Sequence, residues 1–188
     1  MASRELSTLI APLRDAAIKM QQTAKQNGYI LLVYCTFRSF EEQARLYRQS
    51  RTITQIQKKR RQLVRAGYPE LAAILDAVGP QYGTLRKHVT GAGPGESWHQ
   101  YRRAFDAVPV VAGKAQWQNS SPYWQKYGLS AIMAGLEWAG NWNRFREFPH
   151  CQMFAPVSNP LKALSRPEIM MALMYNEQWL EENDEEQV

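Results

Sequence analysis

Residues 97–111 read S-W-H-Q-Y-R-R-A-F-D-A-V-P-V-V, a polar turn followed by an apolar run. The run from Ala104 onward is rich in phenylalanine and valine, so we predict a strand in which Asp106 is the one charged residue. His99, one of three histidines in the chain, lies seven residues before Asp106. A loop that ends at His99 would let both side chains reach one point. The pair fits either half of a metal site or a buried hydrogen-bonded histidine and aspartate.

Working outward from this strand, we expect helices and a few other short strands. Apolar spacing predicts a helix over residues 4–26 and a strand over 29–34. A second helix begins at the Ser39–Glu42 capping box. The basic segment that follows predicts two helices, which are separated by a break near residues 67–69; the second helix covers residues 69–78. A glycine-rich loop lies at residues 91–95.

The remaining elements complete the predicted fold class. Ser121-Pro122 is typical of a helix start, and we expect that helix to run to about Trp138. Residues 150–154 form a candidate strand, and Ser165 with Glu168 caps a last helix. Helices before, between and after short strands indicate an α+β fold, in which a small antiparallel sheet is flanked by helices. A chain of 188 residues fits one domain.

Composition narrows the class of protein further. The first twenty residues carry charges throughout, unlike a secretory signal, and no window approaches eighteen consecutive apolar residues. We therefore expect a product made in the cytoplasm. Two cysteines, Cys35 and Cys151, are too few for a disulfide framework or a four-cysteine zinc site. We interpret both as small buried hydrophobes in a reducing compartment.

The net charge of +6 is unevenly distributed. Residues 51–65 hold six basic side chains and no acid, whereas residues 181–186 hold five acids and no base. Such a surface attracts polyanions, including nucleic acid, anionic lipid head groups and acidic envelope polymers. No motif supports nucleic-acid binding, so we expect none.

Residues 147–150 read E-F-P-H and supply a second group of polar side chains. Zinc bound by two histidines and one aspartate keeps an open position, where a water can lose a proton near neutral pH. Glu147 could take that proton and pass it to the leaving nitrogen of an amide. The alternative is an ordinary solvated glutamate at the entrance of a strand.

The stretch from Ser97 to Asp106 resembles the zinc signature S-x-H-x-x-G-x-A-x-D of a family of peptidoglycan peptidases. That family includes D,D-carboxypeptidases, D,D-dipeptidases and bacteriophage L-alanyl-D-glutamate endolysins. Three further segments are similar to family motifs in the same order: T-F-R-S-F-E-E-Q-A-R-L-Y (36–47), G-L-E-W-A-G-N-W (135–142) and E-F-P-H-C-Q (147–152). With the first strand, the resemblance spans residues 29–154 and implies a D,D-peptidase or hedgehog-like domain.

The resemblance also implies a set of site residues. The ligands of one zinc ion would be His99, Asp106 and His150. Glu147 would be the general base and acid. Arg38 would bind a substrate carboxylate or stabilise an oxyanion in catalysis. Ser97 would bind substrate or hold the ligand loop.

The chain departs from the family pattern at two places. Arg102 stands where the family usually has glycine; in a backbone of positive φ, arginine would cost about 1–2 kcal/mol. The segment 53–88 is longer than the connection that the family implies. It is a candidate lid, an arm that binds an anionic envelope polymer or lipid through residues 51–65, or a helical elaboration with a solvated charged face.

These features predict a zinc metallopeptidase that acts on the peptide stem of peptidoglycan. The lack of a signal or membrane anchor in a short single domain favours an L-alanyl-D-glutamate endopeptidase that serves as a phage endolysin and reaches the wall or periplasm after release. We also expect the protein to be a monomer. Glutamate at position 147 favours the alternative, a D-alanyl-D-alanine carboxypeptidase. A non-catalytic envelope-binding domain is the third alternative, but a purely structural zinc site has no need of Glu147 and Arg38.

Overall fold

A computed structural model describes residues 2–84 and 87–184, with side chains up to Asn176; the acidic tail predicted over residues 181–188 lies outside the described side chains. The chain divides into two compact units. One holds residues 38–100 and the segment from residue 157 onward, and the other holds residues 2–37 and 101–156. The single-domain organisation stays a prediction.

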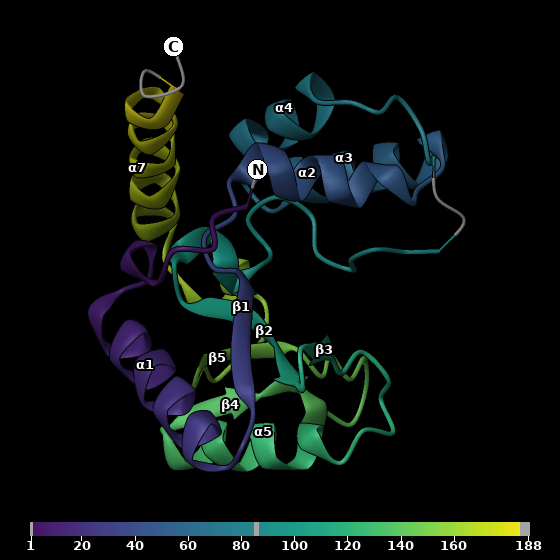
Figure 1. Ribbon diagram of the computed structural model, residues 1–188. Helices are drawn as coiled ribbons and strands as arrows, with labels where there is room; N and C mark the ends of the chain where they lie inside the picture. The colour runs from purple at the N-terminus through teal and green to yellow at the C-terminus, as the bar shows by residue number, and fades with distance from the viewer. Residues whose placement is uncertain (1, 85–86, 185–188) are drawn as a thin grey trace. The chain divides into compact units, whose positions relative to one another are not determined.

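The second unit contains the whole antiparallel sheet, in the strand order β1-β2-β5-β4 (Figure 1). Its strands are β1 (Ile30–Cys35), β2 (Ala104–Val111), β5 (His150–Met153) and β4 (Leu136–Trp138), and the short β3 (Lys114–Ala115) pairs with β2. Three of these strands follow the predicted β-prone runs. The predicted α+β fold class, with a small antiparallel sheet and helices, is confirmed.

Helices α1 (Ala11–Gln26) and α5 (Tyr123–Met133) pack on one face of this sheet. The core includes Leu13 and Met20 from α1, Tyr127 from α5, and Phe105 and Cys151 from adjacent strands. Burial raises the pKa of Tyr127 well above its usual value, and its hydroxyl donates to Pro149 O at 2.7 Å. This face is therefore dry and densely packed.

The Trp138 ring is part of this core and packs directly against two glycines. A Cβ built on Gly128 or Gly140 would lie 2.1 Å from the Trp138 ring, so neither position accepts a side chain without displacement of the ring. The indole Nε1 donates to Phe148 O at 2.7 Å, which satisfies its one polar group. Trp138, in the tryptophan- and glycine-containing segment 135–142, is thus a core packing residue.

Two predicted helix boundaries were wrong. The first helical segment is a short 3-10 helix η1 (Leu6–Thr8) followed by α1, because Pro12 fits only the first turn of a helix and cannot continue an earlier one. Helix α5 ends at Met133 instead of near Trp138. Gly135 adopts a φ of +80°, and the chain then turns into β4.

The first unit consists of helices. These are α2 (Phe40–Gln49), α3 (Ile53–Arg65), α4 (Pro69–Ala77), α6 (Pro160–Ala163) and α7 (Arg166–Asp184), with the 3-10 helix η2 (Trp98–Tyr101) at its boundary. The break between α3 and α4 lies where Gly67 and Pro69 predict it. Ile56, Leu63, Leu71 and Leu75 are buried, so the segment 53–88 has an apolar side of its own.

The basic side chains of α3 are divided between ion pairs and solvent. Lys59 Nζ lies 2.6 Å from Glu96 Oε2, with both side chains mostly buried, and Arg60 Nε lies 2.5 Å from Asp76 Oδ2. Lys58, Arg61 and Arg65 are exposed. The Lys59–Glu96 pair ties α3 to the glycine-rich loop that leads to His99.

Within the described residues, no helix combines the length and the apolar character that a membrane span requires.

Candidate metal centre

The face of the sheet opposite the core carries a row of polar side chains at one level. Asp106 of β2 pairs with His150 of β5, and directly opposite residues of antiparallel strands point to the same face. His150 Nδ1 lies 3.0 Å from Asp106 Oδ1, and the two side chains are 9% and 14% exposed. Two of the three predicted ligands therefore meet at one point, 44 residues apart in the chain.

A chain of hydrogen bonds orients the His150 ring. Its Nε2 lies 3.1 Å from Gln152 Oε1, which can only accept, so Nε2 donates and Nδ1 is the nitrogen that faces Asp106. Gln152 Nε2 donates to Glu137 Oε2 at 2.8 Å, and Trp142 Nε1 donates to Glu137 Oε1 at 2.7 Å. Partners of this kind fix the ring and tautomer of metal-binding histidines.

Sequence reasoning missed this chain of partners. Glu137 and Gln152 lie opposite each other on β4 and β5, two strands that the chain joins through a turn and a 3-10 helix. The one available signal was the two-residue spacing of His150 and Gln152, which puts both side chains on the same face of a strand.

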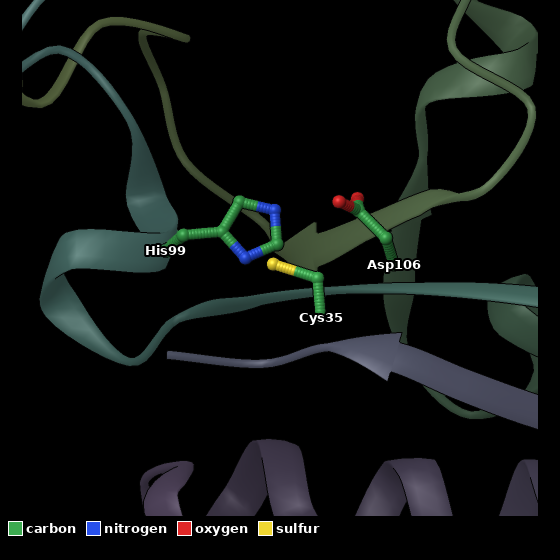
Figure 2. Close-up of side chains that lie close together, drawn as sticks. All are labelled: Cys35, His99 and Asp106. Carbon is green, nitrogen blue, oxygen red and sulfur yellow. The ribbon is translucent and has the colours of Figure 1, made fainter. Parts of the chain in front are cut away.

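His99 lies on η2, five positions before the start of β2, and is 2% exposed. Cys35 of β1 and Asp106 of β2 belong to one unit, and their ligand atoms lie within 4.8 Å of each other (Figure 2). The backbone N–H of Arg38 donates to the His99 carbonyl at 3.5 Å. Cys35, which the sequence alone predicts to be a packing residue, thus lies beside Asp106, a predicted metal ligand.

Glu147 lies in the turn that enters β5, and its side chain is exposed. Backbone hydrogen bonds fix the turn: Glu147 N–H donates to Ala139 O at 3.3 Å, and His150 N–H donates to Glu147 O at 3.1 Å. The carboxylate is therefore held three residues from His150 on a defined backbone, in contact with solvent.

The side chain of Arg38 is half-buried at the entrance to α2. Its Nη1 donates to Gln43 Oε1 at 2.9 Å, and Gln43 Nε2 donates to Ala92 O at 2.7 Å. Gln43, fully buried, thereby links Arg38 to the glycine-rich loop. Ser97 is half-buried at the end of that loop, where its N–H lies 3.3 Å from Gln100 Oε1.

Arg102 adopts a φ of 59°, the left-handed conformation that the glycine of the signature predicts. Two contacts offset the strain of a side chain at this position. Its Nη1 donates to Thr8 O at 2.8 Å, and its guanidinium lies 4.2 Å from the centre of the Phe37 ring. The backbone keeps the conformation that a glycine would favour, and the arginine side chain binds the N-terminal segment.

Comparison with known proteins identifies relatives of this chain. Residues 7–133 match the family model described as VanY: D-alanyl-D-alanine carboxypeptidase. The chain is 28% identical over 149 residues to the peptidoglycan L-alanyl-D-glutamate endopeptidase CwlK of Bacillus subtilis (strain 168), a match that covers 75% of this chain and 71% of that protein.

A solved structure is also similar. The crystal structure of Serratia marcescens L-Ala D-Glu endopeptidase ChiX aligns with a TM-score of 0.42 and 18% identity, covering 82% of this chain and 89% of that chain. The family match covers His99 and Asp106 and ends before Glu147 and His150.

Proposed function

The chain belongs to the VanY family of D-alanyl-D-alanine carboxypeptidases, and on that premise we propose that it is a zinc-dependent peptidase of bacterial peptidoglycan. The family predicted from the sequence is thereby confirmed. The observation that carries the zinc proposal is the 3.0 Å approach of His150 Nδ1 to Asp106 Oδ1. Both atoms are typical zinc ligands, and they lie on adjacent strands of one sheet.

The adjacent side chains of Asp106 and His150 fit one zinc ion. His150 offers Nδ1 while its Nε2–H is held by Gln152, and Asp106 offers a carboxylate oxygen beside it. His99, buried on η2, supplies the third ligand of the proposed set. When bound, zinc supplies Lewis-acid polarisation of the amide carbonyl and a lowered pKa for the attacking water.

Glu147 is proposed as the group that moves the proton. Its carboxylate takes a proton from the attacking water and delivers it to the amide nitrogen as the carbon–nitrogen bond breaks. The exposed position of the side chain suits both transfers, because water and substrate can reach it. The backbone bonds of its turn fix the main chain of Glu147 relative to that of His150.

Arg38 is proposed to bind the substrate. Stem peptides carry carboxylates, and a guanidinium binds such groups with paired hydrogen bonds, or stabilises the oxyanion of the tetrahedral intermediate. The bond from Nη1 to Gln43 holds one edge of the guanidinium, so the planar group has a defined orientation. Ser97 is proposed as a weaker contact at the end of the ligand loop.

We propose that the bond cleaved is the L-alanyl-D-glutamate bond and that the enzyme works as a monomeric phage endolysin. A relative of 28% identity over 75% of the chain, named for that activity, supports the bond choice. The basic charge of the chain favours approach to an anionic wall, with the exposed part of residues 51–65 as the contact. The alternative is removal of the terminal D-alanine, which the name of the matching family supports.

Digestion of purified sacculi tests the proposal. The chain is incubated with sacculi with and without a chelator, and new termini are identified by mass spectrometry. A free glutamate amine supports the endopeptidase, and released D-alanine supports the carboxypeptidase. Glu5→Gln, at another exposed glutamate, is the matched control for Glu147→Gln. Cleavage that survives both chelation and Glu147→Gln would contradict the zinc mechanism.

The role in lysis needs a separate experiment. Expression together with a holin is expected to lyse the host, whereas expression of the chain alone is not. Lysis without the holin would contradict the proposal that the enzyme waits in the cytoplasm.

A further inference from the structure

Cys35 extends the polar row of the sheet to a third strand. Its partner across β1 and β2 is Asp106, and Asp106 in turn pairs with His150 across β2 and β5. Three adjacent strands therefore present sulfur, oxygen and nitrogen atoms at one level on one face. Cys35 is 3% exposed, which confirms the predicted burial of this residue.

An irregularity in β1 puts Cys35 in this row. Val33 pairs with Ala107 and Cys35 with Asp106, so two steps along β1 correspond to one step along β2. In a regular ladder Cys35 would instead face Phe105, on the side of Val33 and the core. A β-bulge re-aims side chains in this way and is common beside active sites.

The two cysteines of the sheet lie on opposite faces. Cys151 belongs to the hydrophobic core with Val33 and Phe105, whereas Cys35 is not among the members of that core. Burial raises the pKa of the Cys151 thiol, which keeps it a neutral packing group. Cys35 and Asp106 instead have ligand atoms within 4.8 Å of each other (Figure 2).

We propose that the Cys35 thiolate is a ligand of the metal ion, bound together with Asp106. The proposal rests on the zinc site proposed above and adds sulfur to a donor set that otherwise contains nitrogen and oxygen. The attacking water would then be a fifth ligand, which catalytic zinc accepts in the transition state. A thiolate is a soft ligand that zinc accepts readily and that magnesium, calcium and manganese do not favour. The sulfur therefore selects zinc over harder divalent ions and tightens its binding.

X-ray absorption at the zinc edge, on the full wild-type chain loaded with zinc, tests the proposal without any variant. A zinc–sulfur distance of about 2.3 Å is expected beside the shorter distances of about 2.0–2.2 Å to nitrogen and oxygen. A spectrum with nitrogen and oxygen neighbours alone would overturn the role of Cys35 and leave the zinc peptidase intact. No uptake of zinc at all would overturn both proposals, so the two failures are distinguishable.

Two variants sharpen the result. Cys35→Ser is expected to lose the sulfur signal and to bind zinc at least about tenfold more weakly, since changes even beyond the direct ligands cost about 10–100-fold in metal affinity. Cys151→Ala removes the other thiol of the same sheet and is expected to keep the signal. Cobalt-loaded protein supplies an independent readout, because a thiolate ligand adds an intense charge-transfer absorption. A sulfur signal that persists in Cys35→Ser and disappears in Cys151→Ala would contradict the assignment.

Discussion

The two faces of strands β2 and β5 have different roles: one packs the hydrophobic core, and the other carries the proposed metal ligands. Phe105 and Cys151 point into the core, while their neighbours Asp106 and His150 form the polar row. Because side chains alternate along a strand, the pairing of residues 105–106 with residues 150–151 places two side chains in the core and two in the proposed metal site. The two roles should therefore be separable by substitutions one residue apart.

Glu147→Gln should give the largest change confined to the polar side. The amide cannot accept and return the proton, so cleavage of sacculi should fall by about 10²–10⁴-fold. The exposed side chain contributes little to packing, and the free energy of unfolding should change by less than about 0.5 kcal/mol. Turnover and urea unfolding measure the two effects. A stable variant with full activity would remove Glu147 from the mechanism.

Phe105→Ala should affect the core face instead, by lowering the free energy of unfolding without changing zinc binding. Phe105 is fully buried, and truncation to alanine in a core costs about 3–5 kcal/mol in the free energy of unfolding. The zinc bound per folded chain should not change, because Asp106 and His150 point away from the cavity that is created. Chemical denaturation and metal analysis report the two quantities separately. Loss of zinc from molecules that remain folded would show that the two faces are coupled.

Gln152→Ala should have a smaller effect, on the site alone. It removes the acceptor for His150 Nε2, and loss of such a partner costs about 10–100-fold in metal affinity or activity. Competition with a chromophoric chelator measures the affinity. Gln116→Ala is a suitable control, since that amide bonds Lys114 O on the β3 side of the sheet. Equal zinc affinity in both variants would refute the orienting role.

The smallest expected effect is a decline in the free energy of unfolding at alkaline pH, caused by Tyr127 on the core face. Burial raises the pKa of Tyr127 above 10.0, so the unfolded chain loses this proton first as pH rises. The contribution to the free energy of unfolding is complete below pH 10.0 and declines above it. In Tyr127→Phe the decline should be shallower, and the lost bond to Pro149 O should cost about 0.5–1.5 kcal/mol at neutral pH. Denaturation at pH values on both sides of 10.0 checks this, and identical slopes would contradict it.

The sequence predicts the elements that depend on local pattern. β2 is visible as an apolar run around one aspartate, and the break between α3 and α4 is visible in Gly67 and Pro69. The positive φ of Arg102 also follows from a local comparison with the glycine of the signature. Each of these features is decided by neighbours within a few residues.

Features that depend on cross-strand pairing were not predictable. The alternation of Leu31, Val33 and Cys35 predicts one buried face, and the bulge after Val33 reverses it for Cys35 alone. Glu137 was hidden for a related reason, since the predicted helix through residue 138 covers a strand. Helix and strand patterns overlap over so short an apolar run, and only the pairing with β5 decides between them.

The bond from Arg102 to Thr8 has a practical consequence for anyone who trims or tags this protein. The backbone strain at residue 102 is compensated by an oxygen near the amino terminus, and residues 103–106 lead from that point directly to Asp106. A deletion through Thr8 would remove the compensation and leave the strain four residues from the proposed metal. Expression plasmids should therefore preserve the first ten residues and carry any affinity handle at a distance from them.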